Sequence, residues 1–261
     1  MPEADVADAP IRVDVDRREA AHWDSVARTV TDAELMQAVN LNDADRRRLE
    51  LCGDLRGKKV LDAGCGSGLW SVLLAQRGAQ VFAIDISPEM VALTQRRAAL
   101  VGVGESVIAQ TMSARKLEFA DGTFDCVTGQ DIVHHLEPGD FGREVARVLA
   151  LGGRAVFREN CGNNPILMWA RDTLCGRFGI SKWSSDDEYP LTPKRRKDFT
   201  RHFSSTRIEH PEFVVFHYVD AKFFRYKVKM LTFICRAIDR LVYRVPALRK
   251  FSYRQLIACT R

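Results

Sequence analysis

The sequence predicts an α/β protein built on a doubly wound, mostly parallel sheet, and three observations support this fold class. Between residues 58 and 158, short apolar segments alternate with stretches of helical periodicity, which is the pattern of βαβ units. Three glycines, Gly64, Gly66 and Gly68, follow the first apolar segment directly. Polar residues stand where several predicted strands end, which is where ligands bind in open α/β sheets.

Residues 1–54 are predicted to form an N-terminal helical cap. The segments 18–27 and 32–50 are rich in charge and have helical composition. Trp23 lies in the first of them, and a tryptophan in a polar helix most often serves as a packing anchor.

Residues 55–160 are predicted to form the core of the sheet. The predicted strands are 58–63, 80–85, 106–111, 124–129 and 154–158, and the predicted helices are 69–77, 88–101 and 141–150. Asp62, Asp85, Gln130 and Glu159 come at the ends of four of these strands. Because the carboxyl ends of parallel strands lie along one edge of a sheet, the sequence predicts a ligand site at that edge.

The most specific motif is the segment 58–68, KKVLDAGCGSG. A strand, a glycine turn and a helix place a ligand against the backbone N–H groups at the helix start. Glycine permits positive φ there and lets the main chain approach the ligand closely. The spacing G-x-G-x-G differs from the dinucleotide fingerprint G-x-G-x-x-G, and the Gly-Lys-Ser/Thr ending of a P-loop is absent.

A carboxylate, Asp85, closes the second predicted strand 23 residues after Asp62. This separation is near the ~20 residues expected for an acid that binds a ribose, whose two hydroxyl donors a carboxylate accepts. The following Ser87 and Pro88 are typical of a helix N-terminus. Both roles are compatible, with Ser87 capping the helix and Asp85 binding the ribose.

Residues 161–261 are predicted to complete the sheet. The segments 205–218 and 252–259 have strand character, and 219–243 between them forms a basic amphipathic helix. Its cations are Lys222, Arg225, Lys229, Arg236 and Arg240. Such a helix packs on the sheet or over a site with a solvated outer face, or it lies on a membrane surface or covers a lipid-like substrate.

Composition limits the class and location of the protein. With 261 residues, 46% of them hydrophobic, the chain suffices for one sizeable α/β domain. The seven cysteines form no C-x-x-C pair, which suggests neither zinc binding nor redox work and fits a reducing cytoplasm. Residues 1–16 lack the apolar run of a secretory signal, and no stretch has the length and apolarity of a membrane span. We expect a cytoplasmic protein, or one peripheral to the membrane.

Charge is distributed unevenly along the chain. The net charge is +5, but residues 194–261 hold 17 Lys and Arg against 5 Asp and Glu. This asymmetry indicates an anionic partner for the C-terminal part, or a solvated basic surface. The aromatic residues of 219–243 are on its apolar side and are not interleaved with the cations, so nucleic-acid binding is not expected.

The segment 58–68, Asp85 and the segment 113–136, SARKLEFADGTFDCVTGQDIVHHL, resemble the class I S-adenosylmethionine-dependent methyltransferases of the ubiquinone/menaquinone-type small-molecule branch. The resemblance covers residues 55–160. It implies a Rossmann-like sheet of seven strands with the last antiparallel, N-terminal helices and a helical insertion before the last strand. It also implies S-adenosyl-L-methionine as the cofactor.

The resemblance implies a set of cofactor-binding residues. They are Trp23, Asp62, Gly64, Cys65, Gly66, Gly68, Asp85, Ile86, Met90, Ser113, Ala114, Gln130 and Asp131. In this branch an acidic residue usually stands at the position of Ser113, so the backbone N–H of Ala114 is the alternative partner for the adenine. Trp23 falls where an N-terminal helix folds over the cofactor in such enzymes. Gln130 and Asp131 fall where the methionine part and the rim of the substrate pocket are placed.

Methyl transfer from a sulfonium is an in-line displacement, in which the protein supplies alignment and, where needed, a base. The candidate bases are His134, His135, Glu159 and His217, and histidine suits this role because its pKa lies near neutrality. Paired histidines at this position also pack a helix in many relatives. No clustered carboxylates of a metal-dependent member are apparent, so no metal is expected.

The sequence therefore predicts a methyltransferase acting on a small, lipophilic or anionic acceptor, at oxygen or carbon in preference to nitrogen. A protein or RNA methyltransferase is the alternative, disfavoured because GQDI stands in place of an Asn-Pro-Pro-Tyr-type motif. A non-catalytic S-adenosylmethionine-binding regulatory protein is a third reading. The expected partners are the small acceptor and, through 219–243, a membrane surface.

Overall fold

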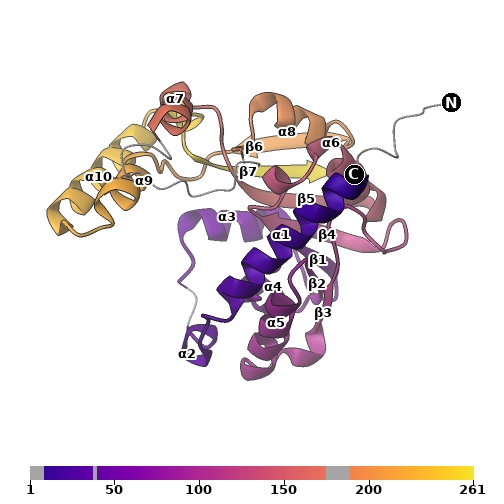
Figure 1. Cartoon of the computed structure of the whole chain (residues 1–261). Helices are drawn as coiled ribbons and strands as arrows, with labels where there is room; N and C mark the ends of the chain where they lie inside the picture. Colours follow the sequence, from indigo (N-terminus) through magenta and orange to yellow (C-terminus); the bar gives the residue numbers. More distant parts are fainter. Residues whose placement is uncertain (1–8, 38–39, 175–188) are drawn as a thin grey trace. The chain divides into compact units, whose positions relative to one another are not determined.

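The structure is a computed structural model that describes residues 9–37, 40–174 and 189–261 (Figure 1). The chain divides into two compact units. Unit 1 comprises Met1–Asn40, Asp54–Gly129 and Arg147–Gly153, and unit 2 comprises Leu41–Gly53, Gln130–Ala146 and Arg154–Arg261.

The strands form a seven-stranded sheet in the order β3-β2-β1-β4-β5-β7-β6. Their bounds are β1 Lys59–Ala63, β2 Gln80–Asp85, β3 Val107–Thr111, β4 Phe124–Gln130, β5 Leu149–Asn160, β6 Ser205–Glu209 and β7 Arg254–Thr260. β1 pairs in parallel with β2 and β4, and β2 pairs in parallel with β3. β7 runs antiparallel to both β5 and β6. The predicted seven-stranded sheet with an antiparallel last strand is confirmed.

The helices of unit 1 are α1 Ala9–Ala27, α2 Asp32–Leu35, α4 Leu69–Ala75 and α5 Pro88–Leu100. Their ends follow the sequence chemistry: Thr31 and Glu34 form a capping box on α2, and Ser87 caps α5. In the strands, Val60, Leu61 and other apolar side chains are fully buried, as expected of parallel strands that are covered on both faces.

The helices of unit 2 are α3 Asp43–Cys52, α6 Pro138–Val148, α7 Pro165–Leu174, α8 Pro193–Thr200, α9 Phe216–Val219, α10 Lys229–Tyr243 and α11 Pro246–Arg249. A phenylalanine cluster forms part of the core of this unit. The rings of Phe141, Phe157 and Phe199 lie 5.2 to 5.9 Å apart, centroid to centroid, and all three side chains are buried. Phe157 packs edge-on against both other rings, and such contacts add to the burial of apolar area.

Several predicted boundaries are wrong. The strand predicted over 205–218 ends at Glu209, because Pro211 follows and has no N–H for a ladder. The helix predicted over 32–50 is two helices, since residues 42–45 start a new one with its own capping box at Asn42. α1 begins at Ala9, well before the predicted residue 18, and β5 already begins at Leu149.

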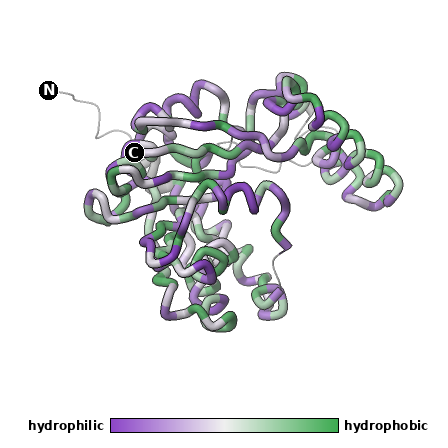
Figure 2. Tube along the Cα trace, turned by 180° about the vertical axis from the view of Figure 1, so that it is seen from behind, coloured by the Kyte–Doolittle hydropathy of each residue, from purple (hydrophilic) through white to green (hydrophobic). Residues whose placement is uncertain are grey.

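The single helix predicted over 219–243 is also wrong. A π-helical turn spans Asp220–Phe224, and Arg225 and Tyr226 then adopt positive φ of 51° and 57°, which ends the helix. The carboxylate of Asp239 on α10 accepts three backbone N–H groups at the start of α9. This contact requires α9 to fold back on α10, so the chain between them has to turn. Figure 2 shows apolar and polar positions alternating along this part of the tube.

Candidate functional site

The glycine turn between β1 and α4 is shaped by three residues with positive φ. Gly64, Gly66 and Gly68 have φ of 71°, 52° and 78°. A Cβ on Gly68 would lie 2.7 Å from the Cα of Thr94, so this glycine allows α4 to pack against α5. A Cβ on Gly66 would meet no described atom within 4 Å. The turn therefore leaves open space beside Gly66, at the N-terminus of α4.

Asp85 lies beside this space at the end of β2. Its Oδ2 accepts the N–H of Gly66 at 2.9 Å, and its Oδ1 accepts the N–H of Ser87 at 3.0 Å. Burial raises the pKa of Asp85, and the backbone N–H groups oppose this shift. Since a carboxylate oxygen accepts more than one hydrogen bond, each oxygen keeps capacity for a hydroxyl donor. Ser87 caps α5 as predicted, accepting from the N–H of Met90.

Asp62, near the end of β1, and Cys65, in the turn that follows, are both buried. The hydroxyl of Ser71 donates to Oδ2 of Asp62 at 2.6 Å. Burial, with the nearby charges of Asp85 and Asp62, raises the pKa of the Cys65 thiol well above its ordinary value. Cys65 is therefore a thiol that stays protonated and fills the turn, not a nucleophile.

Trp23 on α1 and Met90 on α5 take part in the packing of these two helices. Met90 belongs to a buried cluster with Ala27, Leu35 and Leu93, and Trp23 packs against that cluster. The packing-anchor role considered for Trp23 is thus observed. Nearby, the carboxylate of Asp24 accepts from the hydroxyl of Ser87 at 2.5 Å and from the N–H of Glu89 at 3.3 Å. Sequence reasoning missed Asp24, because no spacing rule relates α1 to α5.

Ser113 follows β3, and its side chain is hydrogen-bonded to a carboxylate of α1. Its hydroxyl donates to Oδ2 of Asp16 on α1 at 3.1 Å, and Arg115 holds the other oxygen of Asp16 at 2.7 Å. An acidic group therefore does lie at Ser113, although the sequence has none there. Ala114 is buried and Ile86 is half-buried.

In unit 2, a buried pair joins the end of β5 to the turn after β4. Nδ1 of His134 lies 2.7 Å from Oε2 of Glu159, and both side chains are buried. Oε1 of Glu159 accepts the N–H groups of Ile132 and Val133 at 2.9 and 2.8 Å. An ionised carboxylate only accepts, so Nδ1 of His134 carries the hydrogen and Nε2 is the basic nitrogen. The ring of His135 lies 4.4 Å from that of His134.

Asp131 has a strained backbone, with φ of 55° in a residue that is not glycine. Its N–H donates to the carbonyl of Arg158 at 2.9 Å, and its carboxylate forms an ion pair with Arg254, the first residue of β7. The amide oxygen of the neighbouring Gln130 accepts from Arg48 at 3.4 Å. Sequence reasoning did not single out Arg48 or Arg254.

Two tyrosines lie near this ion pair. The ring of Tyr253 lies 4.5 Å from that of Tyr218, and burial raises the pKa of Tyr253 to about 12. Its phenol therefore stays protonated near neutral pH. His217, the fourth candidate base, is on α9, where its Nε2 lies 3.2 Å from the hydroxyl of Tyr226 and the two rings stack.

Asp131, His134 and Glu159 also present ligand atoms within 4.8 Å of one another. These atoms already have protein partners: Glu159 accepts two N–H groups and contacts His134, and Asp131 pairs with Arg254. The donors form a satisfied hydrogen-bond network, so they give no reason to assign a metal.

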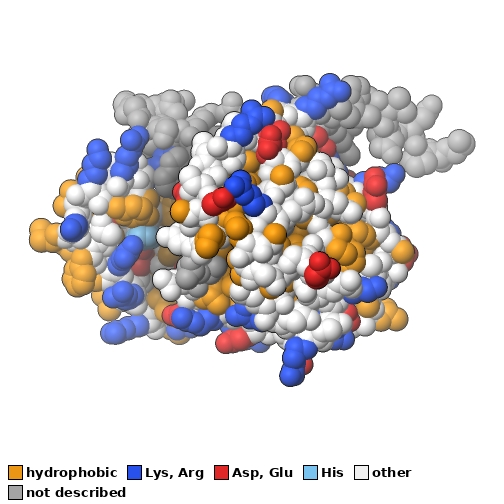
Figure 3. Space-filling view, turned by 90° about the horizontal axis from the view of Figure 1, so that it is seen from below, with side chains coloured by type: hydrophobic (Ala, Val, Ile, Leu, Met, Phe, Trp, Pro, Cys, Tyr) orange, Lys and Arg blue, Asp and Glu red, His pale blue; other side chains and the backbone are white. Residues whose placement is uncertain are grey.

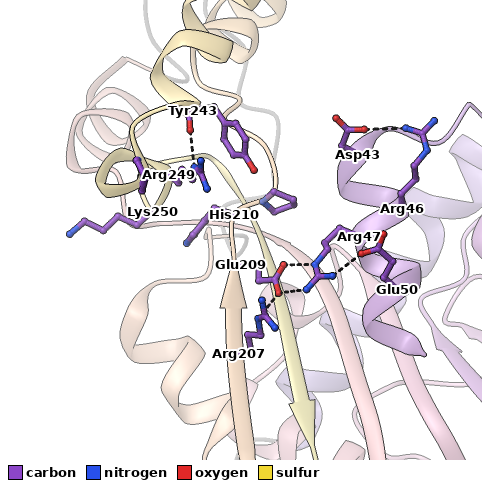
Figure 4. Close-up of a pocket in the computed structure, with 12 residues that line it drawn as sticks. Asp43, Arg46, Arg47, Glu50, Arg207, Glu209, His210, Tyr243, Arg249 and Lys250 are labelled. Atoms are coloured by element: carbon purple, nitrogen blue, oxygen red, sulfur yellow. Dashed lines mark hydrogen bonds and ion pairs between the residues drawn. The ribbon is translucent and has the colours of Figure 1, made fainter. Parts of the chain in front are cut away.

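A separate open cavity of about 640 Å³ in unit 2 is lined by α3, β6, the end of α10 and α11 (Figure 4). Arg47 bridges Glu50 and Glu209 there, each at 2.7 Å. The Nε of Arg249 donates to the carbonyl of Tyr243 at 2.8 Å, with the guanidinium 4.3 Å from the ring centroid. Most charges of this cavity are thus engaged with one another. Within the ranges that the structure describes, no helix has the length and apolar character needed to cross a membrane.

The central part of the chain is similar to known proteins. Residues 61–157 match the family model described as "Methyltransferase domain". The chain is 32% identical over 153 residues to the ubiquinone biosynthesis O-methyltransferase of Cronobacter sakazakii, covering 57% of this chain and 62% of that one. It is 32% identical over 143 residues to the chloroplastic tocopherol O-methyltransferase of Arabidopsis thaliana, covering 51% and 41%. The matches thus span about half the length of these curated relatives.

Solved structures agree on the fold. A geranyl diphosphate methyltransferase in complex with GPP and sinefungin has a TM-score of 0.60 at 20% identity, covering 95% of this chain and 99% of that one. A likeness at this identity speaks for the fold alone. Residues 61–157 are therefore similar to known methyltransferase domains, and the described sheet has the fold of this solved structure.

Proposed function

We propose that the chain binds S-adenosyl-L-methionine on unit 1 and transfers its methyl group to a small acceptor. The observation that carries the proposal is the open space at Gly66, which lies at a helix N-terminus beside the carboxylate of Asp85. Backbone N–H groups at a helix start and a carboxylate with spare acceptor capacity suit the amino acid and ribose parts of this cofactor.

The other predicted contacts fit the same reading. Asp85 accepts the ribose hydroxyls, and the N–H of Ala114 serves the adenine. Asp16, which Arg115 and Ser113 hold in place, offers a carboxylate for the exocyclic amino group. Asp62, Cys65, Met90 and Trp23 support the turn and the helix over it, and Ile86 adds an apolar surface. The roles of Gln130 and Asp131 at the methionine part and the acceptor rim remain predictions from the resemblance.

When bound, the cofactor supplies an electrophilic methyl group. We propose that His134 is the base that takes the acceptor's proton, because Glu159 fixes its tautomer with Nε2 basic. Glu159 itself is a positioning residue, since its oxygens accept from His134 and two N–H groups. His135 and His217 are the second-choice bases.

We propose a lipophilic acceptor, methylated at oxygen or carbon. The names of the two relatives point to ubiquinone and tocopherol, and both compounds carry long hydrocarbon chains. An acceptor of this kind resides in membranes, so we also propose a peripheral membrane contact through residues 219–243 of an otherwise cytoplasmic protein.

Transfer of a labelled methyl group from S-adenosylmethionine to a panel of phenolic and quinol acceptors tests the function. We expect His134→Gln to lower kcat about 10²–10⁴-fold while the cofactor Kd is unchanged. In the His134→Gln variant, the dependence of kcat on pH should lose the step that reports the base. The His135→Gln variant should keep that step. An unchanged kcat in His134→Gln would remove the base assignment. Cofactor binding without transfer to any acceptor would favour the regulatory reading.

A further inference from the structure

The segment Phe216–Lys250, here called the arm, exposes apolar and basic side chains together. Figure 3 shows hydrophobic and basic side chains gathered on it, at the left of the view. Met230, Phe233 and Leu241 of α10 are 72%, 69% and 63% exposed. Side chains of this size are seldom so exposed in a group unless the surface has a partner.

α10 has two apolar faces, and the residues that the structure describes cover only one of them. Cys235 is buried, and Leu231, Ile238 and Val242 on its side of the helix are partly buried. The exposed apolar side chains form a second stripe about 100° wide on the helical wheel. Its members are Met230, Phe233, Ile234, Ala237 and Leu241. Packing within the described part of the chain therefore accounts for one apolar face of α10. It does not explain why the second face is apolar.

The charged side chains at the surface of the arm are all positive. Nine Lys and Arg stand between Phe216 and Lys250, against two acids, Asp220 and Asp239. Both acids are buried, and Asp239 is engaged by three backbone N–H groups. Lys229 and Arg240 lie next to the exposed stripe on the wheel, and neither has an ion-pair partner within the described part of the chain.

We infer that α10 lies flat on an anionic lipid bilayer, with the exposed stripe among the acyl chains and Lys229 and Arg240 at the headgroups. An apolar stripe bordered by cations is the pattern of an interfacial helix, and each cation near an anionic surface adds to binding. A second copy of the chain is a poorer partner, because it would bring nine like charges against these nine. The inference rests on the proposed membrane contact but requires neither cofactor nor methyl transfer.

Co-sedimentation of the whole protein with phosphatidylcholine vesicles, with and without phosphatidylglycerol, tests this without cofactor or acceptor. The protein should bind the anionic vesicles. Lys229→Gln/Arg240→Gln should weaken that binding about 30-fold, from ~1 kcal/mol per cation. Lys194→Gln/Lys197→Gln on α8 removes the same charge from exposed positions and should bind as the parent does.

A second pair of variants tests the apolar stripe. Met230→Ser/Phe233→Ser should weaken binding at least tenfold, whereas Leu151→Ser, at a side chain 88% exposed in unit 1, should not. Equal binding of neutral and anionic vesicles would overturn the inference, as would stripe variants that bind like the parent. So would a dimer, detected by analytical ultracentrifugation, that these variants dissociate. Calorimetry with S-adenosylmethionine tests the proposed function separately, because the arm variants should keep the parent's affinity.

Discussion

At the scale of single residues, Asp85 has two structural duties besides the role proposed for it. Its two oxygens hold the N–H of Gly66 and the N–H of Ser87, so one side chain fixes both the glycine turn and the start of α5. Removing it therefore changes the shape of the site as well as its chemistry. The consequence is that a substitution at this position affects stability and cofactor affinity together, and the two have to be measured separately.

We expect Asp85→Ala to weaken S-adenosylmethionine binding by roughly 1–3 kcal/mol and to lower the free energy of unfolding by a similar amount, because two N–H groups lose a charged acceptor. Asp85→Asn keeps one acceptor oxygen and should lie between Ala and the parent. Calorimetry and urea unfolding measure the two effects. Asp125→Asn, an aspartate that pairs with Lys58, is the control and should leave cofactor affinity unchanged.

The pH dependence of cofactor binding follows from the same residue. Burial raises the pKa of Asp85, so this carboxyl gains its proton at a higher pH than an ordinary aspartate does. Only the ionised form accepts both ribose hydroxyls, so affinity should decline from that higher pH downward. A cofactor affinity that does not fall as the pH is lowered would contradict the ribose role.

Local spacing identified some site residues and could not identify others. Gly64, Gly66 and Gly68 and the carboxylate at the end of β2 stand within one βαβ unit, where spacing and geometry are directly related. Asp16 meets Ser113 across 97 residues, and Arg254 meets Asp131 across 123. Such contacts depend on how elements pack, which no local pattern encodes.

At the scale of elements, periodicity predicted the strands of the core well and the arm poorly. Each core strand has an apolar run and a βα turn that agree with each other. In the arm, the helical period continues through Arg225 and Tyr226, yet tertiary contacts override it. The carboxylate of Asp239 on α10 is hydrogen-bonded to the start of α9. Arg225 and Tyr226, in the connecting segment, adopt positive φ at a cost of about 1–2 kcal/mol each.

The substitutions Arg225→Gly and Arg225→Ala test whether the helix is interrupted at this residue, as in the structure, or continuous, as the sequence predicted. With φ of 51°, Arg225→Gly should be more stable than Arg225→Ala by ~1 kcal/mol, because only glycine adopts this region freely. In a continuous helix the order reverses, with alanine favoured by ~1 kcal/mol. Urea unfolding of both variants decides between them. Ala237→Gly, inside α10, should cost ~1 kcal/mol and calibrates the measurement.

At the scale of the whole molecule, the strand order explains which predictions succeeded. A parallel sheet with one antiparallel strand follows from alternating βα units and a final strand without a preceding crossover. The matched domain lies in that regular part, residues 61–157. The C-terminal hundred residues contribute β6, β7 and the arm, where sequence patterns gave the elements but misplaced their ends.

Ligand binding should be visible in the stability of the whole protein. A ligand that binds only the folded state stabilises it by RT ln(1 + [L]/Kd), about 2.7 kcal/mol at a hundredfold excess over Kd. We therefore expect S-adenosylhomocysteine to raise Tm by roughly 5–10 °C in a chain of this length, and NAD to leave it unchanged, because the turn has the spacing G-x-G-x-G.

The Tm of Asp85→Ala, assayed at the same ligand concentration, should rise less because its Kd is higher. The arm variant Met230→Ser/Phe233→Ser should shift as much as the parent, because its substitutions lie on α10. A Tm that responds to NAD and not to S-adenosylhomocysteine would refute the cofactor assignment, whatever the vesicle experiments show.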